Sequence, residues 1–138
     1  MQRYEINETP AGLRIVAIGS TRAGLAIAAL QGLFAVQHPS EVASEEAAQD
    51  REHPFALKGA NFAELLEKLL QGGLEQAVKN GETYNHFRFD LITDREVKGA
   101  WVGRAAELAT PVKGVTVAEG SVSKREDGAW GAELVIEE

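Results

Sequence analysis

The stretch NFAELLEKLLQGGLEQAVKNG, residues 61–81, constrains the fold of this chain more than any other feature. An aromatic residue and a run of leucines recur at the three- and four-residue spacing that forms the apolar face of a helix. Asn61, followed three residues later by Glu64, gives a capping-box-like start, and the closing Asn-Gly pair fits a helix end. Because glycine disfavours helix interiors, Gly72 and Gly73 predict a close crossing over a strand or a break in the helix.

The rest of the chain is organised around this helix. A second helix is predicted over residues 20–37, capped by Ser20 or Thr21. Apolar alternation predicts strands over 3–7, 12–19, 53–60, 86–92, 97–103, 112–123 and 129–137. The first two strands form a hairpin, and Asp127-Gly128 is a strong turn signal before the last strand. The fold class is therefore α+β, with a mainly antiparallel sheet and two helices on one face.

Two central strands carry the clearest inward-facing residues. Alternation places Phe87, Phe89 and Leu91 on the core side of one strand. It places Val97, Gly99 and Trp101 on one side of the next. Trp101 and Trp130 are accordingly interpreted as core residues rather than as platforms on which bases stack.

Length and composition limit the organisation and the class of partner. A chain of 138 residues can bury one self-sufficient core, so we expect a single domain over residues 1–138, with an exposed acidic loop over 37–52. The absence of cysteine excludes disulfides and thiolate metal sites and is compatible with a reducing compartment. A net charge of -7 disfavours direct nucleic-acid binding. Neither a signal peptide nor a membrane-spanning stretch is recognisable, so we expect a cytoplasmic protein.

No catalytic motif is present, which favours a protein that is not an enzyme. The three histidines, His38, His53 and His86, lie far apart in the sequence and are interpreted as surface residues. The acidic residues of 37–52 lack the ligand spacing of a calcium loop.

Alternation places the charged residue Lys113 on an otherwise apolar face, beside Val115 and Val117. Two interpretations are open. The lysine side chain can extend along the apolar surface to the sheet edge. Alternatively, its ammonium meets an anion, such as the carboxylate of Glu8 or Glu137 on a neighbouring strand.

Several local patterns resemble archease, a small protein with the strand-helix-strand-strand (SHS2) fold. The opening YEI…TPAGLRIVAIGST, the helix FAELLEKLLQGGLEQA, the segment FRFDLITDREVKGAWVG and the closing PVKGVTVAEGSVSKREDGAWGAELVIEE are each similar to the corresponding family segment. The resemblance implies an accessory protein that promotes guanylylation and turnover of the cyclic-phosphate RNA ligase of tRNA splicing. It also implies a bound divalent cation, such as calcium, near the acidic start and end of the chain.

The chain departs from the family at that cation site. The family's metal-binding aspartate falls on Gly12 and its histidine on Thr9, while the aspartate of the closing Asp-Ile pair falls on Glu137. Lys113 and Thr116 match the family and are the candidate residues for binding a partner or an anion. We therefore expect no metal and no other cofactor, with Glu8 and Glu137 as the only weak candidate ligands.

Three hypotheses about the function follow, and the third is from a different class. The first is an archease-like, non-catalytic modulator of a cyclic-phosphate RNA ligase. The second is a diverged SHS2 module that binds another protein or a small ligand, without a metal. The third is an enzyme in which Glu8, Lys113 and Glu137 act as acid-base groups on a small molecule, which requires all three within reach of one substrate.

Overall fold

The structure is a computed structural model that describes residues 2–10, 12–37, 39–41, 50–108, 112–118 and 120–137. The elements within these ranges are β1 (Gln2–Thr9), β2 (Gly12–Gly19), α1 (Arg22–Ala35), β3 (Pro39–Glu41), β4 (Arg51–Lys58), α2 (Phe62–Asn80), β5 (Glu82–Ile92), β6 (Glu96–Leu108), β7 (Gly114–Val117), β8 (Ser123–Lys124) and β9 (Trp130–Glu137). The predicted α+β class is confirmed, because two helices are combined with strands whose described pairings are antiparallel.

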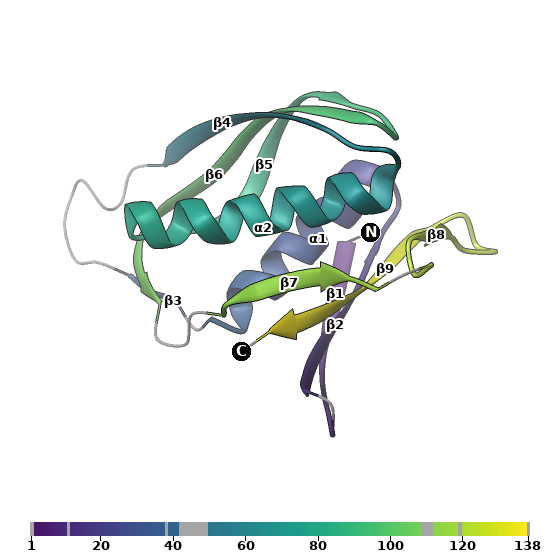
Figure 1. Ribbon diagram of the computed structural model, residues 1–138, viewed down its shortest axis with the longest axis horizontal. Coiled ribbons are helices and arrows are strands. Elements are labelled where there is room, and N and C mark those ends of the chain that lie inside the picture. The colour runs from purple at the N-terminus through teal and green to yellow at the C-terminus, as the bar shows by residue number, and fades with distance from the viewer. Residues whose placement is uncertain are drawn as a thin grey trace.

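The described strands form two sheets, where the sequence predicted one. The first sheet has the order β1-β2-β9-β7, with β8 beside β9. In the second sheet β6 pairs with β3, β4 and β5. Figure 1 shows α1 and α2 in the space between the two sheets, so each sheet has helices against one of its faces.

This position between the sheets explains the composition of α1. Thr21 caps the helix, since its Oγ1 accepts the N–H of Gly24 at 2.9 Å. The whole stretch from Gly24 to Leu30 is buried, as expected for a helix that is apolar on all sides. Its many alanines let it approach both β2 and β5 closely.

The predicted start, end and glycine crossing of α2 are all present. Oδ1 of Asn61 accepts the N–H of Glu64 at 2.9 Å, and Gly81 ends the helix in the left-handed conformation. The helix is not broken at its glycines, which lie over Trp101 instead. A Cβ atom on Gly72 would be 2.9 Å from that indole ring, and the indole N–H donates to the carbonyl of Leu69 at 3.0 Å.

Three details of the sequence prediction need correction. Leu91 is 37% exposed rather than inward, because a β-bulge between Phe89 and Leu91 reverses the alternation. The strand predicted over 112–123 is divided into β7 and β8. Trp130 is only half-buried, with the guanidinium of Arg22 lying 4.8 Å from its ring centroid.

The segment 37–52 is not simply an exposed loop. Gln37 is fully buried, residues 39–41 form β3 against β6, and β4 begins at Arg51. Residue 38 and residues 42–49 lie outside the described residues. Among the described helices, none is long and apolar enough to cross a membrane.

Candidate functional site

The two residues predicted to bind a partner lie at the β7 edge of the first sheet. Lys113 immediately precedes β7 and donates its backbone N–H to the carbonyl of Glu137 at 2.8 Å. Thr116 lies within β7, and both side chains are exposed. No carboxylate of the described residues forms an ion pair with the Lys113 ammonium. The structure therefore shows an exposed lysine at the sheet edge and no ion pair to Glu8 or Glu137.

Lys113 and Thr116 line two adjoining depressions between α2 and β7, which we call the α2–β7 groove. The depression beside Thr116 has a volume of about 510 Å³ and the one beside Lys113 about 340 Å³. They share Gln71 and Glu75 of α2. The groove thus connects the two predicted residues along one surface.

Side chains of α2 close the backbone edge of β7 inside this groove. The N–H of Val115 donates to Oε1 of Gln71 at 3.1 Å, and the N–H of Val117 donates to Oε1 of Glu67 at 2.9 Å. These two N–H groups point away from β9 and are already bonded. A partner in the groove must therefore contact side chains rather than extend the sheet at β7.

The depression beside Lys113 combines apolar and cationic groups. Leu74, Val78 and Val112 contribute apolar surface, and Val78 is 65% exposed. Lys79 and Lys113 line it together with Glu75, so its lining has two cations and one anion. This chemistry suits an apolar side chain flanked by acidic groups.

Glu8 and Glu137, the weak metal candidates, lie on opposite faces of the first sheet. Glu8 pairs with Leu13, which shares its face with Ile15, and Ile15 pairs with Leu134. Side chains alternate along a strand, so Glu137 lies on the other face from Leu134. Their carboxylates do not converge on one ion or one substrate.

The other features of the metal site lead to the same conclusion. Gly12 offers no side-chain ligand, and its φ of 124° disfavours any residue with a Cβ. No group of three or more acidic, histidine or cysteine residues within the described part of the chain could hold a metal ion. The residues present do not fit the family's cation. Glu8, Lys113 and Glu137 all face solvent, so the geometry that the enzyme hypothesis requires is absent.

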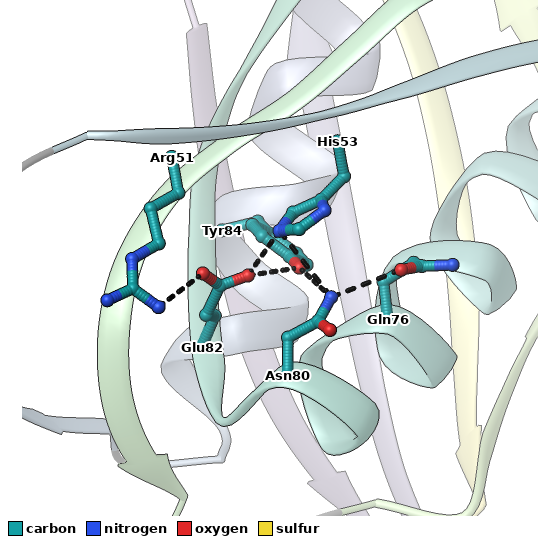
Figure 2. A network of polar contacts seen from close by, with 6 residues as sticks. All are labelled: Arg51, His53, Gln76, Asn80, Glu82 and Tyr84. Carbon is teal, nitrogen blue, oxygen red and sulfur yellow. Dashed lines mark hydrogen bonds and ion pairs between the residues drawn. The ribbon is translucent and has the colours of Figure 1, made fainter.

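A second polar cluster, which the sequence did not indicate, lies between the C-terminal end of α2 and the inner face of the second sheet. Figure 2 shows the carboxylate of Glu82 between Arg51 and His53, with Tyr84 and Asn80 beside it. Glu82 is only 1% exposed. Its Oε1 is 2.6 Å from Nε2 of His53 and accepts the Tyr84 hydroxyl at 2.8 Å, while Arg51 lies 3.2 Å from Oε2.

Each oxygen of the Glu82 carboxylate therefore has at least one donor, as a buried charge requires. Asn80, the last residue of α2, links the helix to the cluster, because its amide N–H donates to the Tyr84 hydroxyl at 3.5 Å. Burial, followed by the neighbouring carboxylate, raises the pKa of the Tyr84 hydroxyl far above its ordinary value of 10.0. The cluster therefore joins α2, β4 and β5.

Gly103 of β6 gives this cluster room, since Arg51 of β4 and Tyr84 of β5 are both its register partners. A Cβ atom at Gly103 would clash with the backbone carbonyl of Thr83 and would also lie 2.8 Å from the Tyr84 ring. His53, interpreted from sequence as a surface residue, is half-buried here, whereas His86 is exposed and His38 lies outside the described residues.

Comparison with known proteins gives a whole-chain match. A family model described as the archease protein family (MTH1598/TM1083) matches residues 4–137. The solution structure of Methanobacterium thermoautotrophicum protein 1598 is similar with a TM-score of 0.64 and 19% identity, covering 98% of each chain.

The crystal structure of a Thermotoga maritima archease, named as a possible chaperone, is similar with a TM-score of 0.61 and 12% identity. The match covers 97% of this chain and 96% of that one. No curated protein matches this chain. At these identities the two solved structures show the shared fold, and the family model gives the membership.

Proposed function

The chain belongs to the archease family, and we propose that it is a non-catalytic accessory protein that binds and modulates a cyclic-phosphate RNA ligase. The family match over residues 4–137 is the observation that carries this proposal. The description of the Thermotoga maritima archease as a possible chaperone supports a protein partner. The dispersed Glu8 and Glu137 favour binding over catalysis.

The α2–β7 groove is the surface proposed to meet the ligase. It contains Lys113 and Thr116, the residues that match the family in the closing segment. Its apolar surface around Val78 and the lysines at 79 and 113 suit a ligase segment that combines apolar and acidic side chains. Since the residues of this chain do not fit the family's cation, modulation is proposed to proceed without a metal.

The test is a guanylylation assay with the cyclic-phosphate RNA ligase encoded in the same genome. Accumulation of the covalent ligase–GMP species is measured with and without this protein, and we expect several-fold faster accumulation when it is present. The Lys113→Glu variant is expected to lose most of this stimulation, because it places a like charge against an acidic ligase segment.

Lys124→Glu is the matched control, because Lys124 is also an exposed lysine but belongs to β8, outside the groove. It is expected to stimulate as the unmodified protein does. Unchanged guanylylation, together with no co-purification of the ligase, would contradict the proposed partner. Equal loss with both lysine variants would contradict the proposed surface.

A further inference from the structure

The two edge strands of the first sheet, β7 and β1, differ in whether their outward edge is covered. At β7 the outward N–H groups of Val115 and Val117 are bonded by side chains of α2. At the opposite edge, β1 pairs only with β2 among the described residues. Such an open edge is a template for pairing with another strand.

The register of the sheet identifies which residues of β1 present their backbone to this open edge. Lys113 and Ala118 donate to the carbonyls of Glu137 and Glu133, so the odd-numbered residues of β9 face β7. In an antiparallel sheet, residues alternate in the neighbour to which they hydrogen-bond. Following the residue pairs through β9 and β2 places the even-numbered residues of β1 outward. These residues are Gln2, Tyr4, Ile6 and Glu8.

The side chains on this edge combine exposed apolar surface with charge. Tyr4 is 37% exposed and Ile6 is 41% exposed, although both lie on the helix-facing side of the strand. On the other side, Arg3 and Glu5 are exposed, and neither is ion-paired within the described part of the chain. The alternation of one cation and one anion makes the edge complementary to its own reversed copy.

We infer that β1 pairs antiparallel with β1 of a second copy of this chain, around a two-fold axis at Tyr4. In this register Tyr4 faces Tyr4 of the other copy, and Gln2 faces Ile6. These are the even-numbered pairs, which exchange backbone hydrogen bonds. The two-fold axis then gives two Arg3–Glu5 pairs, one on each side of the axis. These are the pairs that do not exchange backbone hydrogen bonds, in which side chains approach most closely.

Charge selects this register from the others that the backbone allows. Shifting the axis to Glu5 places two glutamates directly opposite, which is unfavourable. Shifting it to Ile6 places Glu5 against the uncharged Asn7 and loses both ion pairs. Because only a few residues of each chain pair, the dimer is weak and depends on concentration.

The test is sedimentation of the full chain over micromolar to millimolar concentrations, where a reversible monomer–dimer equilibrium is expected. Arg3→Glu places a glutamate opposite Glu5 in both pairs. It is expected to raise the dimer dissociation constant about tenfold or more. The swapped variant Arg3→Glu with Glu5→Arg restores both ion pairs and is expected to return the constant to within about threefold of the original.

Two further variants separate this edge from other surfaces. Ile6→Pro removes an outward N–H that β2 does not use, so it is expected to abolish the dimer and keep the monomer folded. Val78→Asp is the control, since it removes an exposed apolar residue elsewhere and is expected to leave the equilibrium unchanged. Thermal unfolding confirms that each variant is folded. A monomer at every concentration overturns the inference, as does a charge-swapped variant that stays as weak as Arg3→Glu.

Discussion

At the residue scale, Tyr84 shows how burial and charge act on one group. Its side chain is fully buried and its hydroxyl donates to the carboxylate of Glu82 at 2.8 Å. Both the loss of water and the adjacent anion oppose ionisation of the phenol. Because the pKa of Tyr84 is raised in the folded protein, the free energy of unfolding depends on pH in the alkaline range.

We predict that stability falls as the pH rises above 10.0, the ordinary pKa of tyrosine. In the unfolded chain the phenol loses its proton there, whereas in the folded chain it keeps it, so the unfolded state binds fewer protons and is favoured. Tyr84→Phe removes this contribution, so its unfolding free energy should decline less between roughly pH 9 and pH 11. At neutral pH the same variant should be less stable by roughly 1–3 kcal/mol, because the buried carboxylate of Glu82 loses a donor and the amide of Asn80 loses an acceptor.

Urea unfolding at several pH values measures both effects. Tyr4→Phe is the control, since Tyr4 is exposed at the edge strand, and it should follow the unmodified protein. Parallel pH curves for the unmodified protein and Tyr84→Phe would contradict the coupling.

Single residues were predicted from sequence where the signal was local. Alternation predicted the buried position of Trp101. For Lys113 it left two interpretations open, and the structure shows the side chain exposed at the sheet edge. The Glu82 cluster was missed because its members come from β4, α2 and β5, and no spacing in the chain links them. A β-bulge between Tyr84 and His86 also interrupts the alternation that would mark Tyr84 as inward.

At the scale of elements, the crossing of α2 over β6 is the feature that glycine makes possible. We predict that Gly72→Ala lowers the unfolding free energy by about 1 kcal/mol, although alanine favours the helix by a similar amount. The new Cβ would lie 2.9 Å from the Trp101 ring. That ring cannot retreat, because its N–H is bonded to Leu69 and Phe55 lies beside it with ring centroids 5.0 Å apart.

A smaller ring at position 101 provides the matched background for this test. In Trp101→Phe the space above Gly72 is larger, so Gly72→Ala should become stabilising there by about 1 kcal/mol, the helix propensity alone. Chemical denaturation of the four proteins measures the change of sign. An equal effect of Gly72→Ala in both backgrounds would show that the indole ring is not the cause.

Most elements were predictable because residues close together in the sequence determine where they begin and end. The caps at Thr21 and Asn61 and the turn at Asp127-Gly128 are present as expected. Strand β3 was missed, since three residues pairing with β6 carry no periodicity of their own. The ends of these elements are therefore determined by nearby residues, whereas a short strand such as β3 forms because a partner strand pairs with it.

At the scale of the whole molecule, the division into two sheets was not predictable from strand patterns. Alternation states that a strand has an apolar face but not which other strand shares its sheet. The composition of α1, apolar on all sides, was the available signal, because a helix covered by one sheet has a polar face toward water. The placement of α1 between β2 and β5 explains that composition.

The same arrangement leads to a prediction about metals. Glu8 and Glu137 project from opposite faces of the first sheet, and Gly12 replaces the carboxylate that would join them. A ligand stabilises a protein only by binding the folded state more tightly than the unfolded one. We therefore predict that micromolar calcium, magnesium or manganese, added to chelator-treated protein, leaves the midpoint of thermal unfolding unchanged.

Restoring the missing carboxylate should not create the site. Gly12 has a φ of 124°, so an aspartate there strains the backbone by about 1–3 kcal/mol. Gly12→Asp is expected to lower the unfolding temperature by a few degrees and to remain insensitive to the three cations, because Glu137 still points away from Glu8. A rise of several degrees with any of them, in either protein, would show that carboxylates from the two ends of the chain do meet around an ion. The positive φ at Gly12 thus opposes a return of the family's aspartate, and the opposed faces of Glu8 and Glu137 leave a new carboxylate without partners.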